Sequence, residues 1–128
     1  MAWEIPAQKI SLPAGEDLSG SQYCLVKVGD DGNGNPVALL ADGATDPIIG
    51  VLQNKPTQGK VAEIISLGIS RVVAGAAITV GAKLTPAANG RVKTTADTEY
   101  TCGIALASAA GAGEVIPMFI SPVGYQAA

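Results

Sequence analysis

The strongest constraint on the fold is a segment that occurs twice in the chain. Residues 46–68 read DPIIGVLQNKPTQGKVAEIISLG, and residues 100–121 read YTCGIALASAAGAGEVIPMFIS. Gly50 corresponds to Gly103, an offset of 103 − 50 = 53, and Val61 corresponds to Val115, an offset of 115 − 61 = 54. Each copy contains two runs of β-branched and apolar residues separated by a turn-forming stretch. The repeat predicts two similar β-modules rather than a solenoid, which needs about three repeats or more.

Strand-sized runs bounded by glycine, proline and asparagine occupy the rest of the chain. The predicted strands lie at residues 23–28, 37–41, 48–53, 61–66, 69–74, 78–80, 83–85, 91–94 and 115–120. Runs repeated about every 8 to 12 residues predict an all-β fold, here a small compact β-barrel or β-sandwich of short strands. Pro117 has no N–H to donate, so we expect it at a bulge or at an edge.

The first 20 residues differ from the rest, because they lack a hydrophobic period and contain two prolines. We expect an extended N-terminal arm over residues 1–20, followed by a single β-domain over residues 21–128. Two placements are open: the surface of the arm's own domain, or a neighbouring subunit with a tryptophan as anchor, since Trp is enriched at interface hot spots. The candidate binding residues are Trp3, Ile5, Ile10 and Leu12. In the second placement, residues 1–18 are dispensable for folding and needed for binding.

The composition restricts the kind of partner. Hydrophobic residues make up 48% of the chain and charged residues only 15%, against about 25% charged in an ordinary soluble domain. Mean hydropathy is +0.33, yet no apolar run reaches the length of a membrane span. We therefore expect a subunit of a larger assembly, with no membrane partner. A net charge of −3 argues against binding to a phosphate backbone, so nucleic acid is not an expected partner. The start MAWEIPAQK has no features of a signal peptide.

The loop GDDGNGN, residues 29–35, has two interpretations. Asp31, Asn33 and Asn35 match the first three ligand positions of a calcium-binding EF-hand loop, and Asp42 matches the twelfth. Position six of such a loop requires glycine for its sharp turn, but this chain has Pro36 there. Asx and Gly residues are also what a hairpin loop needs for positive φ. We favour the hairpin and expect no metal.

The side chains that most often perform catalysis are scarce. The chain has no histidine, which excludes Ser-His, Cys-His and His-metal chemistry. The two cysteines, Cys24 and Cys102, are too few for a disulfide scaffold. We interpret them as buried, reduced core residues, with a disulfide as the alternative. We therefore predict that the protein is not an enzyme and has no cofactor.

Glycine and valine recur in a pattern through the second half of the chain. The runs are GISRVVAGAAITVGAKL from Gly68, GRV from Gly90, GIALA from Gly103 and GEVIP from Gly113. This pattern resembles that of the tailed-bacteriophage capsid decoration, or cement, proteins, and the resemblance covers about residues 45 to 120.

The resemblance implies a compact β-fold, usually a homotrimer, that binds the outside of an expanded icosahedral head and stabilises contacts between major capsid subunits. The arm then contacts the capsid through Trp3, Ile5, Ile10 and Leu12. The implied partner is the major capsid protein, and the implied location is the outer capsid surface of the virion after synthesis in the host cytoplasm. The alternative function is a virion-surface binding module that recognises a host glycan or receptor.

Overall fold

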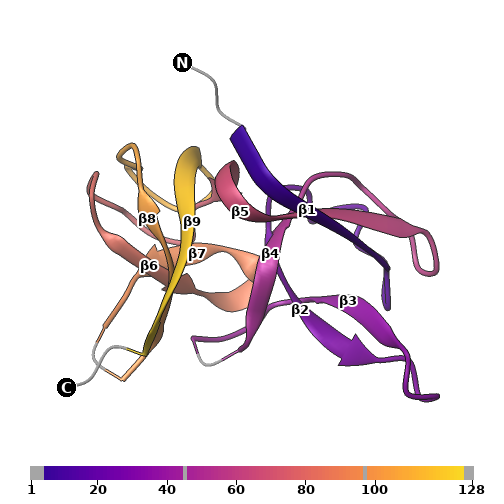
Figure 1. Cartoon of the computed structure of the whole chain (residues 1–128). Coiled ribbons are helices and arrows are strands. Elements are labelled where there is room, and N and C mark those ends of the chain that lie inside the picture. Colours follow the sequence, from indigo (N-terminus) through magenta and orange to yellow (C-terminus); the bar gives the residue numbers. More distant parts are fainter. Residues whose placement is uncertain (1–4, 45, 97, 126–128) are drawn as a thin grey trace.

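The computed structural model describes residues 5–44, 46–96 and 98–125, which form nine strands in one sheet and one 3-10 turn. The elements are β1 (Ile5–Pro13), β2 (Leu25–Asp30), β3 (Pro36–Leu40), β4 (Ile48–Leu52), β5 (Val61–Val73), β6 (Lys83–Pro86), η1 (Ala88–Gly90), β7 (Val92–Thr94), β8 (Tyr100–Ala105) and β9 (Val115–Tyr125). Neighbouring strands pair antiparallel, and the sheet curls around its cores (Figure 1). The all-β prediction is confirmed.

The strand order shows two matching halves joined at β5. Along the sheet the order is β3-β2-β4-β5-β9-β8-β6-β7, with β1 also paired to β5. From β5 outward, the series β5-β4-β2-β3 corresponds to the series β9-β8-β6-β7. We call β1 to β4 with the first half of β5 module one, and the second half of β5 with β6 to β9 module two. Figure 1 shows β5 passing from one module to the other.

The two modules pair their strands in the same register. Module one pairs Val26 with Gly50 and Val51 with Ile65, and module two pairs Leu84 with Gly103 and Ile104 with Phe119. The offsets from β4 to β8 and from the first half of β5 to β9 are 104 − 51 = 53 and 119 − 65 = 54. These are the offsets seen in the sequence, so the structure contains the two similar β-modules.

The second half of β5 corresponds to β1. Leu12 on β1 pairs with Ala62, as Val72 on β5 pairs with Ile116, an offset of 72 − 12 = 60. Both strands end in a parallel bridge to the outer hairpin of their module, Ala14 to Ala38 and Ala74 to Val92. Of the two placements that the sequence left open, residues 5–13 therefore take the one on their own domain, as the first strand of module one.

The buried cores follow the same correspondence. One cluster of buried residues fills module one: Ala14, Leu18, Val26, Ala38, Leu52, Ala62 and Ile64. The second cluster contains the equivalent residues of module two: Ala74, Ile78, Leu84, Val92, Ala105, Ile116 and Met118. It also includes Leu25, Val51 and Ile65 of module one, so this larger core spans the contact between the modules.

Two details differ from the sequence prediction. The predicted runs 61–66 and 69–74 form one strand, β5, because Gly68 pairs on both sides, with Pro6 of β1 and Ile120 of β9. The predicted strand at 78–80 does not form, and Ile78 makes only an isolated bridge to Ala109. The expectation that residues 1–18 are dispensable for folding is wrong for the end of that segment, since Ala14 and Leu18 are buried in the core of module one.

Replacing Leu18 by alanine tests whether this segment is part of the core. Leu18 is 0% exposed, so Leu18→Ala removes buried methyl groups and leaves a cavity, which costs about 2–5 kcal/mol of unfolding free energy. Leu67→Ala, at a leucine that is 42% exposed, is the control and should change it by about 0.5 kcal/mol or less. Urea unfolding followed by circular dichroism measures the unfolding free energy of both variants. Equal, small decreases in the two variants would show that residue 18 lies outside the core.

Gly103 lies against β9 so closely that a side chain has no room. A Cβ built there would lie 2.6 Å from the Phe119 carbonyl oxygen and 2.6 Å from the Met118 sulfur. We expect Gly103→Ala to cost about 1–3 kcal/mol, because the backbone of β9 must move. Nothing lies within 4 Å of a Cβ built at Gly111, so Gly111→Ala is the matched control. Thermal unfolding of both variants checks this, and a neutral Gly103→Ala contradicts the pairing of β8 with β9.

Candidate interaction site

The structure places the predicted binding residues on β1, except Trp3, which lies outside the described residues. Ile10 and Leu12 are partly buried and pack against the core of module one. Ile5 is 52% exposed at the start of β1. Pairing with β5 extends from Ile5 to Pro13, so one edge of this segment already forms its main-chain hydrogen bonds within the chain. Contact of Trp3, Ile5, Ile10 and Leu12 with a capsid stays a prediction. Among the three of them that the structure describes, Ile5 is the most available for such a contact.

The loop between β2 and β3 is a hairpin tip held by its own carboxylates. Asp30 Oδ1 accepts hydrogen bonds from the N–H groups of Gly32 (2.7 Å) and Gly34 (2.9 Å). Asp31 Oδ1 accepts those of Asn33 (2.7 Å) and Asn35 (3.2 Å). These bonds, the Asn33 N–H first, hold the pKa of Asp31 below its usual value. The hairpin interpretation is confirmed, and the tip presents two aspartates at the surface.

Among residues 5–44, 46–96 and 98–125, no three or more Cys, Asp or Glu side chains are grouped as a metal ion requires. The carboxylate oxygens of the β2–β3 tip that would approach calcium instead bind backbone N–H groups.

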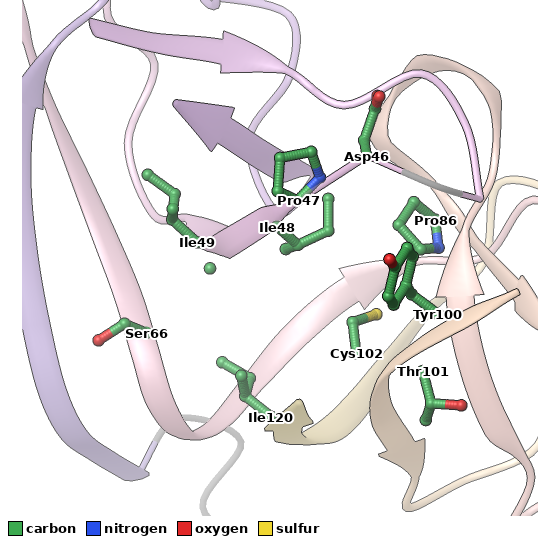
Figure 2. A pocket seen from close by; sticks show the side chains of 11 residues that line it. Asp46, Pro47, Ile48, Ile49, Ser66, Pro86, Tyr100, Thr101, Cys102 and Ile120 are labelled. Atoms are coloured by element: carbon green, nitrogen blue, oxygen red, sulfur yellow. The ribbon is translucent and has the colours of Figure 1, made fainter. Parts of the chain in front are cut away.

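A pocket of about 510 Å³ lies between the two modules (Figure 2). Equivalent positions of the two modules line it, because Pro47, Ile48, Ile49 and Ser66 correspond to Tyr100, Thr101, Cys102 and Ile120. A bulge of β4 lies at this pocket, at Ile49 in the pairing to β2, and the pairing of β8 with β9 is irregular there too, between Thr101 and Gly103. The pocket is thus a product of the duplication.

The polar groups around the pocket are already bonded. The Ser66 hydroxyl donates to the Gln8 carbonyl at 3.3 Å, and the Thr101 hydroxyl donates to the Thr95 hydroxyl at 3.3 Å. Isoleucine and proline side chains provide much of the remaining lining. The pocket therefore suits an apolar group and has no nucleophile paired with a base among its lining residues.

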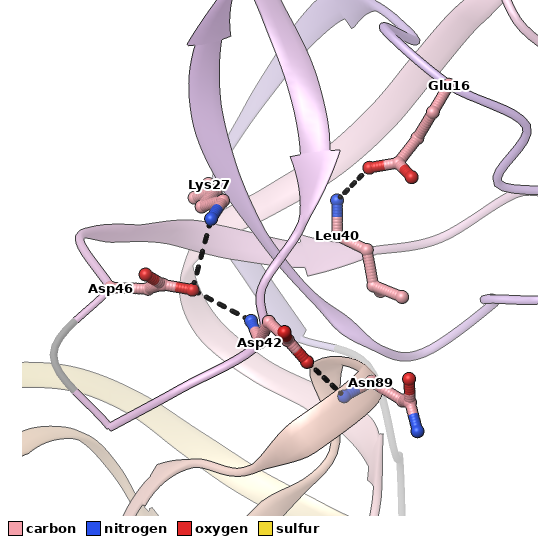
Figure 3. Close-up of polar contacts among 6 residues, drawn as sticks. All are labelled: Glu16, Lys27, Leu40, Asp42, Asp46 and Asn89. Atoms are coloured by element: carbon pink, nitrogen blue, oxygen red, sulfur yellow. Dashed lines mark hydrogen bonds and ion pairs between the residues drawn. The ribbon is translucent and has the colours of Figure 1, made fainter.

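Polar contacts beside the pocket connect the modules (Figure 3). Lys27 Nζ lies 3.3 Å from Asp46 Oδ2, and the same oxygen accepts the Asp42 N–H at 2.8 Å. Asp42 Oδ1 accepts the Asn89 N–H of module two at 3.3 Å. The Asp42 N–H first, and then Lys27, hold the pKa of Asp46 below its usual value. Partly exposed contacts of this kind contribute little energy, so the shared core, rather than these contacts, holds the modules together.

Both cysteines are free thiols and buried, which confirms the interpretation as reduced core residues. Burial raises the pKa of Cys24, and it raises the pKa of Cys102 to about 12. A thiol of this kind is protonated at neutral pH and reacts slowly, because the thiolate is the nucleophile.

Thiol reagents and alkaline pH test this assignment. We expect both thiols to react slowly in the native protein and a reducing agent to leave the melting temperature unchanged. Above pH 9 the unfolded chain loses the Cys102 proton while the folded protein keeps it, so stability falls as pH rises toward about 12. Cys102→Ala should show a smaller alkaline loss, measured by urea unfolding from pH 8 upward. A melting temperature that drops by several degrees on reduction would instead indicate a disulfide.

Large apolar side chains are exposed on several strands and loops of the described chain. The exposed set is Ile5, Val28, Val61, Leu67, Val80, Tyr100, Val115 and Phe119. Within the described residues, no helix has the length and apolar character needed to cross a membrane. The sequence did not distinguish Phe119 from its equivalent Ile65, although Ile65 is buried and Phe119 is 44% exposed.

Comparison with known proteins supports the interpretation of the fold. A crystal structure of the bacteriophage phi29 head fiber gp8.5 N base superposes with a TM-score of 0.69 and 23% sequence identity, over 90% of this chain and 94% of that chain. At that identity the likeness establishes the fold. No curated protein sequence matches this chain.

The sequence model of one protein family spans nearly the whole structure. It is described as phage cement protein and matches residues 7–120, from β1 into β9. It therefore includes both modules, the pocket and the exposed strands, and the resemblance read from the glycine and valine pattern is confirmed. The chain belongs to the phage cement protein family.

Proposed function

We propose that this protein binds the outer surface of an expanded phage head as a homotrimer and stabilises contacts between major capsid subunits. The observation that carries the proposal is the match of the phage cement family over residues 7–120. Because that match includes β1, both cores and the strands between them, the function belongs to the folded unit as a whole rather than to an appended segment.

The surface chemistry supports binding to another protein. Only 15% of the residues are charged, and eight large hydrophobic side chains of the described chain are exposed. Apolar surface of this kind on a small domain marks an interaction site, since its burial on a partner is favourable. Three tethered subunits would increase the strength of head binding by avidity.

The fold is also suited to a mechanical role. Each module has its own buried core, and β5 belongs to both modules. A sheet continuous across two cores moves as one body, so it transmits force between the surfaces that it joins. The free thiols of Cys24 and Cys102 fit synthesis in a reducing compartment such as the host cytoplasm, before the protein reaches the outer capsid surface of the virion.

Co-sedimentation with empty heads tests the function. We expect the purified protein to sediment with expanded heads, to bind unexpanded heads at least about tenfold more weakly, and to raise the temperature at which expanded heads break. Equal binding to both head forms contradicts a role specific to the expanded lattice. Binding to a host glycan array without binding to heads would favour the alternative, a module that recognises a host receptor.

A further inference from the structure

One row of exposed apolar side chains crosses four neighbouring strands. Ile5 on β1 pairs with Ile69 on β5, and Ile69 pairs with Phe119 on β9. Phe119 also pairs with Ile104 on β8. Side chains of directly paired residues lie on the same face of a sheet, so these four form one continuous row. We call it the Phe119 row. Ile5 is 52% exposed and Phe119 is 44% exposed, while Ile69 and Ile104 are partly exposed.

Module one contains the equivalent row, and the part of it on β2, β4 and β5 is covered. Val51 on β4 pairs with Ile65 on β5 and with Leu25 on β2. These residues correspond to Ile104, Phe119 and Lys83 of module two. Leu25, Val51 and Ile65 are 1%, 0% and 1% exposed, because they belong to the core that includes buried residues of module two. In module one, the partner of this face is a second module of the same fold.

The element that covers the Leu25 end of this face can be identified. Gly90, in the η1 turn between β6 and β7, lies so close to module one that an added Cβ would be 2.5 Å from the Leu40 side chain and 2.9 Å from the Leu25 carbonyl oxygen. The hairpin β6–β7 of module two corresponds to β2–β3 of module one. The equivalent of the covering turn is therefore the β2–β3 tip, with Asp30 and Asp31.

From these observations we propose that the Phe119 row is the surface on which a second copy of this chain docks, with the β2–β3 tip of that copy over the end of the row at Lys83. The contact repeats between chains the packing seen between modules within one chain. It is head-to-tail, because the row lies on module two and the tip on module one, and head-to-tail contacts form closed rings such as trimers when the rotation between copies closes. The inference rests on the homotrimer part of the proposed function and names its interface.

The charges fit this arrangement. Where module one has the buried Leu25, module two has the exposed Lys83. Where module two has an uncharged covering turn, Ala87 to Gly90, module one has the exposed carboxylates of Asp30 and Asp31. The contact between modules is uncharged at both positions, whereas the contact between copies brings Lys83 to the carboxylates of the tip. Such opposite charges select the correct partner and register more than they add affinity.

Sedimentation velocity of the full-length chain over a range of concentrations tests the proposal. We expect the wild-type protein to self-associate, and Phe119→Asp to weaken association by about 30-fold or more, the scale of a central aromatic anchor. Ile5→Asp, at the other end of the row, is a second variant in case Phe119→Asp does not fold. Val80→Asp is the matched control: Val80 is 58% exposed and outside the row, so its variant should associate like the wild type.

A second pair of variants examines the charged end. Lys83→Glu should weaken association and make it stronger, not weaker, with added salt, since it replaces attraction to the acidic tip by repulsion. Asp31→Asn keeps an oxygen for the N–H groups of the tip and should partly restore association when combined with Lys83→Glu. If the two changes are simply additive, the β2–β3 tip does not face Lys83, and that part of the proposal is wrong.

The outcomes separate the interface from the proposed function. A wild-type protein that stays monomeric overturns the inference, and head co-sedimentation still decides the function. A Phe119→Asp variant that folds and associates normally also overturns it. If that variant associates normally but no longer binds expanded heads, the row contacts the capsid, which overturns the inference and supports the function. Loss of association with unchanged melting, together with a normal Val80→Asp control, supports the inference.

Discussion

The antiparallel pairing along β5 is the interaction on which the rest of the structure depends. This strand closes module one with its first half and opens module two with its second half. Gly68 lies between the halves with a φ of 110°, a conformation that glycine adopts without steric cost, and it pairs with both β1 and β9. The backbone hydrogen bonds of β5 hold strands of both modules. Neither module can therefore separate without breaking strand pairs of the other. The larger core, which includes buried residues from both modules, adds to this coupling.

A duplicated fold has a consequence for its surface. Equivalent positions have equivalent strand partners within their module, yet their exposure differs wherever one module covers the other. Ile65 is buried by module two, whereas its equivalent Phe119 is open to solvent. The low fraction of charged residues has two causes. Apolar residues fill the interiors of both modules, and further apolar residues form faces that remain available for other chains. A structural role on a virion needs such faces and no reactive groups.

Much of the architecture can be predicted from local patterns. The offsets of the repeat match the strand register, since Gly50 and Gly103 each lie where a partner strand leaves no room for a Cβ. The tip at 30–35 forms a hairpin because the Asp30 and Asp31 carboxylates accept its backbone N–H groups and its glycines adopt positive φ. The prediction that Pro117 lies at an edge holds only locally. β9 is an interior strand, but its ladder with β8 ends at the pair of Ala105 and Met118, so Pro117 pairs with β5 alone. On the open side its carbonyl accepts the Leu106 N–H.

The sequence by itself determined the class of the fold, the two modules, the reduced cysteines and the family, because each depends on spacing and residue type over short stretches. Only the tertiary structure decided that β1 belongs to module one. Residues 1–20 have no period of their own, and the partners of residues 5–13 lie 48 to 64 residues further along the chain. It also decided which apolar residues are covered. Burial depends on what packs against a strand from outside, and two copies of one pattern cannot show which of them has a neighbour. For that reason Ile10 and Leu12, chosen from the sequence as binding residues, pack inward, and Phe119, which the sequence did not single out, is exposed.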